Sequence, residues 1–201
     1  MLRAEPSLTV RRRSPSAFQS RGLDCGCRGA GGRRQFLRVA GAAGLAGLGA
    51  GLFPLRAFAA DLPAVALLLS CIDYRLTTQT VNYMTRQKLT DQYDHLTLAG
   101  ASLGAQTIFP FWVGTFWEEF KIALKLHPKI DRVYLLDHRD CGAYKEVFGI
   151  DFAKNPPLET RVHADELRKL KGTIIGQYPK FTVDTVHMGL MDLKGNVETI
   201  D

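Results

Sequence analysis

The chain has 201 residues and a formal net charge of +6, but its positive charge is concentrated at one end. Residues 1–60 contain ten arginines against two acidic residues, whereas residues 61–201 contain sixteen lysines and arginines against eighteen acidic residues. The larger part therefore carries a charge of −2, so the basic composition gives no reason to expect nucleic-acid binding. It contains about 140 residues, enough for one domain that buries roughly two-thirds of its unfolded surface.

Residues 33–60 resemble a twin-arginine export signal. Arg33-Arg34 precede a weakly apolar, glycine-rich run at 39–53, and residues 57–59 have the small-x-small pattern of a cleavage site. The run is shorter than the about 20 strongly apolar residues that a membrane span needs. We predict that residues 1–60 are a disordered basic segment followed by a cleavable signal peptide. The twin-arginine export machinery would then be a partner and the protein periplasmic; the alternatives are a retained membrane anchor and a wrongly assigned start codon.

The export route bears on the cysteines of the domain. Twin-arginine export carries folded proteins, so a metal can be inserted in the reducing cytoplasm beforehand. Cys71 and Cys141 are the cysteines that remain after cleavage, and two nearby thiols could form a disulfide in an oxidising periplasm. A metal bound earlier would protect them. Cys25 and Cys27 have no histidine nearby, and we predict no metal site there.

In chain order, the sequence pattern predicts strands that alternate with helices. The expected elements are a strand at 64–70, a helix at 77–88, a strand at 93–98, a helix at 106–127, a strand at 133–136, a short helix at 144–148, a loop at 155–157, a helix at 159–171, a strand at 181–191, a hairpin turn at 192–196 and a short strand at 197–200. Alternation of this kind predicts an α/β fold with a mainly parallel, Rossmann-like sheet.

Three of the helices differ in the pattern of their side chains. The first has a modest apolar face of Val81, Met84 and Leu89. The longest carries large apolar residues at every fourth position, which predicts core packing or, alternatively, a partner-subunit interface: Trp112, Phe116, Phe120 and Leu124. In the helix at 159–171, Val162, Leu167 and Leu170 are expected to face inward and the charged residues to form a solvated face.

Reactive groups follow two of the predicted strands. The strand at 64–70 leads into Cys71-Ile72-Asp73-Tyr74-Arg75, and the strand at 133–136 leads into Asp137-His138-Arg139-Asp140-Cys141-Gly142. Ligands bind at the carboxyl ends of strands in parallel sheets, so we expect Cys71, His138 and Cys141 to meet there. Two thiolates and one imidazole are three of the four ligands of tetrahedral zinc, and an open fourth position is typical of catalytic zinc.

Small residues occupy the turn at 99–104, after the second strand. Backbone can approach a ligand closely where side chains are small, so Gly100 and Ala101 are candidate substrate-binding residues, as is Gly142. The alternative for this turn is an ordinary connection from a strand to a helix.

These motifs resemble those of the β-class carbonic anhydrases, which carry Cys-x-Asp-x-Arg after the first strand and His-x-x-Cys-Gly after the third. Cys71, Asp73 and Arg75 match the first motif, and His138, Cys141 and Gly142 match the second. The resemblance covers the predicted mature chain in order, including the closing strand and hairpin. It implies a four-stranded parallel sheet of order 2-1-3-4 with a short antiparallel edge strand and helices on both faces.

The resemblance also implies roles for these residues. Cys71, His138 and Cys141 would hold one zinc ion per chain, and a zinc-bound hydroxide would hydrate CO2 to bicarbonate. Asp73 would accept a hydrogen bond from the zinc-bound water and would be held by Arg75; in some members the equivalent Asp closes onto the zinc. A homodimer is implied as well. Candidate groups for carrying the proton away are His95, His163, His187 and Tyr74.

The chain departs from the family pattern at three places. It has Leu98-Ala99-Gly100-Ala101-Ser102 where an Asn-Ala-Gly-Asn type of turn is common, and Asp137 where a Gly usually precedes the ligand His. The predicted mature chain also begins almost at its first strand, without the helices that wrap around a partner subunit in many members. Because of these departures, the resemblance alone does not establish the substrate, the catalytic rate or the formation of a dimer.

Other functions stay open at this stage. The same site could hydrolyse a CO2-like molecule such as CS2 or COS, or it could be a non-catalytic periplasmic zinc-binding module in which Asp73 completes the coordination. A dithiol protein without metal is disfavoured, because Cys71 and Cys141 do not form the Cys-x-x-Cys motif typical of redox sites. Phosphatase chemistry is also disfavoured, because Cys71 and Arg75 are too close in sequence for a phosphate-binding loop.

Overall fold

A computed structural model describes residues 63–106 and 110–201. The predicted basic segment and signal peptide lie outside the described residues. Within those ranges, none of the helices combines the length and the apolar character needed to cross a membrane.

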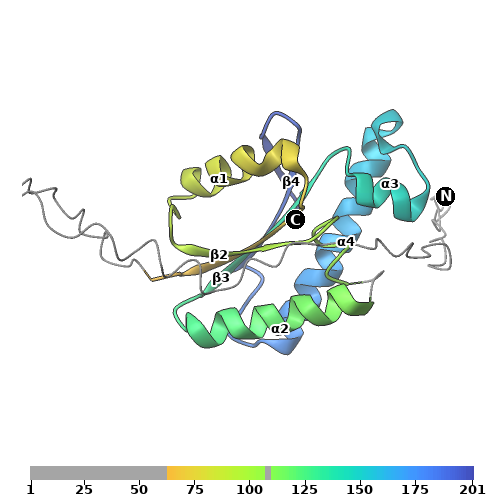
Figure 1. Cartoon of the computed structure of the whole chain (residues 1–201). Coiled ribbons are helices and arrows are strands. Elements are labelled where there is room, and N and C mark those ends of the chain that lie inside the picture. The colour runs from red at the N-terminus through yellow and green to blue at the C-terminus, as the bar shows by residue number, and fades with distance from the viewer. Residues whose placement is uncertain (1–62, 107–109) are drawn as a thin grey trace, which may run out of the picture. The chain divides into compact units, whose positions relative to one another are not determined.

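A five-stranded sheet forms the centre of the domain, with strand order β2-β1-β3-β4-β5 (Figure 1). The strands are β1 (Ala66–Ser70), β2 (Tyr93–Thr97), β3 (Arg132–His138), β4 (Val186–Met191) and β5 (Val197–Thr199). The first four are parallel and β5 is antiparallel to β4. The predicted α/β fold, strand order and antiparallel edge strand are confirmed.

Helices cover both faces of this sheet, with α1 on one side and α2 and α4 on the other (Figure 1). The helical elements are η2 (Tyr74–Leu76), α1 (Thr77–Arg86), α2 (Pro110–Leu126), α3 (Gly142–Phe148), η3 (Phe152–Lys154) and α4 (Pro156–Gln177). Side chains that alternate along β1 explain the two layers: Leu68 packs with Met84 of α1, whereas Leu67 and Leu69 pack in a larger core with Phe116 and Phe120 of α2. The aromatic positions Phe116 and Phe120 are therefore core residues.

The boundaries of α4 differ from the prediction. Its helix begins at Pro156, not at Glu159, because Asn155 caps it: the Asn155 side-chain oxygen accepts a hydrogen bond from Leu158 N at 3.2 Å. Prolines are tolerated at the first helical positions, where the missing N–H has no partner to lose. The predicted loop at 155–157 is therefore wrong.

Two other local predictions are also wrong. The strand predicted at 181–191 begins only at Val186, because residues 182–185 close a turn in which Thr182 N donates to Thr185 Oγ1 at 2.8 Å. Of the apolar face predicted for the first helix, Met84 and Leu89 are buried as expected, but Val81 is 48% exposed and the polar Thr80 is buried instead.

The charged residues of α4 are not all on a solvated face. Glu159 and Glu166 are buried together with the apolar residues Val162, Leu167 and Leu170. Burial of Glu159 is compensated by hydrogen bonds to the loop that carries two of the predicted metal ligands, as described below.

Candidate metal centre

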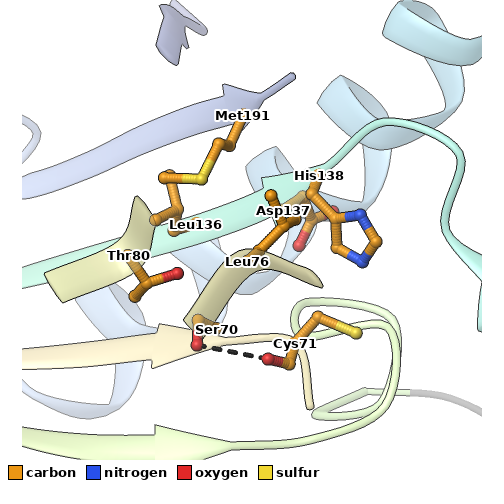
Figure 2. A pocket seen from close by; sticks show the side chains of 8 residues that line it. All are labelled: Ser70, Cys71, Leu76, Thr80, Leu136, Asp137, His138 and Met191. Atoms are coloured by element: carbon orange, nitrogen blue, oxygen red, sulfur yellow. Dashed lines mark hydrogen bonds between the residues drawn. The ribbon is translucent and has the colours of Figure 1, made fainter. Parts of the chain in front are cut away.

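Cys71, His138 and Cys141 meet at the carboxyl edge of the sheet. Cys71 directly follows β1, His138 is the last residue of β3, and Cys141 is the residue that precedes α3. The ligand atoms of all three lie within 4.8 Å of one another, and the two sulfur atoms are 3.9 Å apart. Figure 2 shows the Cys71 and His138 side chains at this edge, each at the end of its own strand.

The His138 ring is oriented as a metal ligand would be. Its Nδ1 donates a hydrogen bond to the carbonyl oxygen of Arg139 at 2.8 Å, which leaves Nε2 with the free lone pair. That Nε2 is buried and has no hydrogen-bond partner among the described residues. A buried ring nitrogen without a partner is costly unless something else binds it, and a metal between the two sulfurs would do so.

The two thiols differ in their ionisation. Cys141 Sγ lowers the pKa of the Cys71 thiol most, against the effect of burial, and His138 and the Gly100 N–H, 3.3 Å from Cys71 Sγ, lower it further. Contact with Cys71, followed by burial, raises the pKa of Cys141. Burial opposes protonation of His138, but its contact with Cys71 raises its pKa overall. A soft divalent cation would favour the thiolate form of both cysteines, so this donor set fits zinc.

Asp73 lies beside the three ligands and is held by Arg75. Arg75 Nε donates to both carboxylate oxygens at 3.0 and 3.2 Å, Nη2 donates to Oδ2 at 2.7 Å, and the Arg75 N–H donates to Oδ1 at 3.0 Å. These bonds hold the pKa of Asp73 below its usual range. Asp73 Oδ2 is 3.9 Å from His138 Nε2, so the carboxylate lies next to the cluster of candidate ligands.

Arg75 is in turn fixed by the loop between His138 and Cys141. Its Nη1 donates to Asp140 Oδ2 at 2.9 Å and its Nη2 to the Asp140 carbonyl at 3.0 Å. The Asp140 N–H donates to Glu159 Oε1 at 2.6 Å, which anchors the loop to α4. Asp140 has a left-handed backbone (φ 54°), a conformation that Asp tolerates better than most residues. The sequence analysis missed the contributions of Asp140 and Glu159.

The predicted substrate-binding residues have backbone roles beside the ligands. Gly100 adopts φ +76°, and a Cβ there would lie 3.1 Å from Ala143 Cβ, which explains the glycine. Ala101 is buried in the core, and Gly142 is the first residue of α3. Substrate binding by these three residues stays a prediction.

Two cavities border Cys71 under the first turn of α1. The smaller, of about 10 Å³, is also lined by His138 (Figure 2). The larger, of about 190 Å³, is lined by Ser70, Cys71, Ile72, Thr77, Thr80, His95 and Thr97. Neither is lined by Gly100, Ala101 or Gly142. Most of the polar side chains that line the larger cavity carry hydroxyl groups: Ser70, Thr77, Thr80 and Thr97.

The four candidate proton-transfer groups occupy different positions. His95 lines the larger cavity and its Nε2 is 2.7 Å from Ser70 Oγ, next to Cys71 in the chain. His163 is fully buried, and His187 stacks on Tyr134 away from the carboxyl edge. Tyr74 is 86% exposed. His95 is thus the candidate that shares a cavity with a ligand residue and also reaches solvent.

Comparisons with known proteins identify the family. Residues 63–201 match the model of the family described as "Putative carbonic anhydrase". The chain is 37% identical over 128 residues to an uncharacterized protein of Rickettsia conorii, covering 63% of this chain and 68% of that protein. It is 35% identical over 128 residues to an uncharacterized protein of Rickettsia bellii, covering 63% and 77%.

Similar solved structures include two carbonic anhydrases. That of Streptococcus mutans is 15% identical with a TM-score of 0.46, over 84% of this chain and 92% of the other. That of Glaciozyma antarctica is 13% identical with a TM-score of 0.44, over 84% and 93%. The family model spans most of the sequence, and the chain belongs to the carbonic anhydrase family that it describes.

Proposed function

We propose that this protein is a β-class carbonic anhydrase that hydrates CO2 reversibly to bicarbonate with one zinc ion per chain. One observation carries the proposal: the ligand atoms of Cys71, His138 and Cys141 lie within 4.8 Å of one another, beside a carboxylate held by an arginine. His138 Nε2, which has no hydrogen-bond partner among the described residues, is the free ring nitrogen. Membership of the carbonic anhydrase family supports it.

Cys71, His138 and Cys141 would hold the zinc. Zinc bound in such a site lowers the pKa of water towards 7 and so supplies a hydroxide nucleophile for attack on CO2. Two hydrogen bonds orient ligands of this site. His138 Nδ1 donates to Arg139 O, and Gly100 N donates to Cys71 Sγ.

Asp73 would act as the carboxylate that orients the attacking water. Arg75 lowers the pKa of Asp73 and holds the carboxylate beside the cluster, where it would accept a hydrogen bond from the O–H of that water. The new C–O bond gives bicarbonate and one proton. His95 is our candidate to accept that proton and deliver it to buffer, because it shares the larger cavity with Cys71.

Stopped-flow CO2 hydration, with metal content measured on the same sample, tests this function. We expect rapid turnover at about pH 8.5, since two thiolate ligands raise the pH at which the nucleophile forms. Asp73→Asn should lower the rate by about 100-fold or more and retain the zinc, whereas Asp184→Asn, at an exposed position outside the site, should change neither.

Three results would contradict the proposal. Full CO2 hydration in Asp73→Asn would rule out the role of Asp73. Zinc without turnover would favour CS2 or COS as substrate, or a non-catalytic zinc module. Protein purified under reducing conditions without any zinc would rule out the metal centre.

We also propose that residues 1–60 direct export by the twin-arginine pathway to the periplasm. The Arg33-Arg34 pair and the weakly apolar run behind it support this. Replacing both arginines by lysine should retain the protein in the cytoplasmic fraction as the uncleaved precursor. Export of the double variant at the normal level would contradict the proposal.

A further inference from the structure

The residue before the ligand His138 is the most deeply buried carboxylate near the site. Side chains alternate across a strand, so Asp137 and His138 at the end of β3 point in different directions. The Asp137 side chain is 0% exposed. A carboxylate removed from water in this way is very costly unless hydrogen bonds replace its hydration.

Four donors surround Asp137. Its Oδ1 accepts from the Ser102 N–H at 3.0 Å, and its Oδ2 accepts from Ser102 Oγ and Tyr144 OH, each at 2.6 Å, and from His163 Nδ1 at 2.9 Å. A carboxylate can accept several hydrogen bonds at once, so these four contacts together replace the hydration that Asp137 loses on burial. We call Asp137, Ser102, Tyr144 and His163 the Asp137 hub.

The hub joins the stretch that carries His138 and Cys141 to the turn that contacts Cys71. Ser102 is two residues after Gly100, whose N–H donates to Cys71 Sγ. Tyr144 is three residues after Cys141, in the first turn of α3. Asp137 is adjacent to His138. His163 ties the same carboxylate to α4. One buried side chain therefore connects the surroundings of Cys71, His138 and Cys141.

We propose that Asp137 is a positioning residue for the metal centre, acting through Ser102 and Tyr144 to hold the three ligands at the separation that a metal requires. The inference rests on the metal of the proposed function, but not on CO2 hydration. Without the hub, the separate segments around the ligands would have to be ordered when the metal binds, and this ordering lowers affinity. Replacing a residue that orients ligands in this way typically lowers metal affinity by about 10- to 100-fold.

Zinc affinity of the full chain, measured by competition with a chromophoric chelator, tests the proposal. Asp137→Ala would leave several buried donors unpaired and endanger folding, so smaller changes are preferable. Tyr144→Phe removes one hydroxyl and keeps the ring, and Ser102→Ala removes one hydroxyl from the turn. Each should weaken zinc binding by about 10-fold or more. Each should also shift the thiolate-to-metal charge-transfer band of the Co2+-substituted protein, which reports the ligand geometry directly.

Ile174→Val is the matched control for a general loss of stability. Ile174 is fully buried in α4, about three turns from His163, and is not part of the hub. It should lower the urea midpoint without changing zinc affinity or the Co2+ band.

Three outcomes decide the matter. The proposal is overturned if Tyr144→Phe and Ser102→Ala lower the urea midpoint as Ile174→Val does but leave zinc affinity and the Co2+ band unchanged. It is also overturned, together with the proposed function, if the wild type binds neither zinc nor cobalt. If the hub variants weaken metal binding but the wild type does not hydrate CO2, the inference stands and the proposed function fails.

Discussion

Asp73 and Asp137 each have four hydrogen-bond contacts beside the proposed metal ligand His138, but they obtain them in different ways. The four contacts of Asp73 come from three N–H groups of Arg75, two residues away, and the carboxylate is 15% exposed. The donors of Asp137 come from three segments of the chain, and its side chain is 0% exposed.

This difference separates two tasks. A carboxylate paired locally with a partly exposed arginine can change its partner without disturbing the fold, as a group that contacts a reacting molecule must. A buried carboxylate with partners on three segments cannot move unless those segments move, so it suits a supporting role. We call Asp73, Arg75 and Asp140 the rim, in contrast to the Asp137 hub.

The largest effect on bound zinc is expected from changing one of the proposed ligands, which lie between the rim and the hub. Cys141→Ser should reduce bound zinc from about one ion per chain to almost none, because a serine hydroxyl is a poor zinc ligand. Metal analysis after dialysis against a weak chelator measures this. As a control, the double variant Cys25→Ser/Cys27→Ser of the precursor should retain its zinc. Loss of zinc from that variant would show that Cys25 and Cys27 bind the metal.

A hub variant should cost more stability than a rim variant. Ser102→Ala removes one of three donors to Asp137 Oδ2 and should lower the free energy of unfolding by about 1–3 kcal/mol, as expected when a buried polar group loses a hydrogen-bond partner. Urea unfolding of the metal-free protein measures it. Thr115→Ala removes an exposed hydroxyl that donates to Phe111 O, and it should lower the free energy of unfolding by only a few tenths of the loss in Ser102→Ala.

On the rim, Asp140→Asn should change the free energy of unfolding by less than about 1 kcal/mol. The ion pair with Arg75 is well exposed, and such pairs contribute little. Asn also tolerates the left-handed backbone at this position. The same urea experiment at low and high salt measures the effect; a loss larger than that of Ser102→Ala would reverse the comparison.

The smallest effect should come from a titratable group outside both regions. Burial, followed by Lys171 and Arg132, lowers the pKa of His187 below its ordinary value. The unfolded chain therefore takes up this proton at a higher pH than the folded chain, so stability falls as pH decreases below about 6.5. His187→Gln should make this fall shallower, by less than about 1 kcal/mol because the ring is partly exposed. An unchanged slope in urea titrations from neutral to mildly acid pH would contradict it.

The sequence predicted most of what depends on short-range pattern. Apolar runs and alternating patterns located the four parallel strands, and the motif after β1 placed Asp73 two residues from its partner Arg75. Local pattern was misleading where capping or turn formation competes with it. Asn155 starts α4 ahead of the amphipathic stretch, and a turn replaces the first half of the strand predicted at 181–191.

The buried polar residues were the main omission. Asp137 was noted only as a departure from the family pattern, His163 only as a proton-transfer candidate, and Glu159 was assigned to a solvated face. One signal was available: an aspartate that directly continues a fully apolar strand occupies a buried position and requires donors. Which residues supply those donors does not follow from spacing, because Ser102, Tyr144 and His163 lie 35, 7 and 26 residues from Asp137.

The sequence by itself therefore determined the α/β fold class and the residues able to bind a metal, because periodicity and ligand chemistry are properties of short segments. Only the tertiary structure decided that Cys71, His138 and Cys141 lie within 4.8 Å of one another and that Asp140 and Glu159 fix Arg75. It also decided that Asp137 is satisfied from three directions. Contacts of this kind arise from packing helices and loops against the sheet edge, and the residues involved have no fixed separation along the chain.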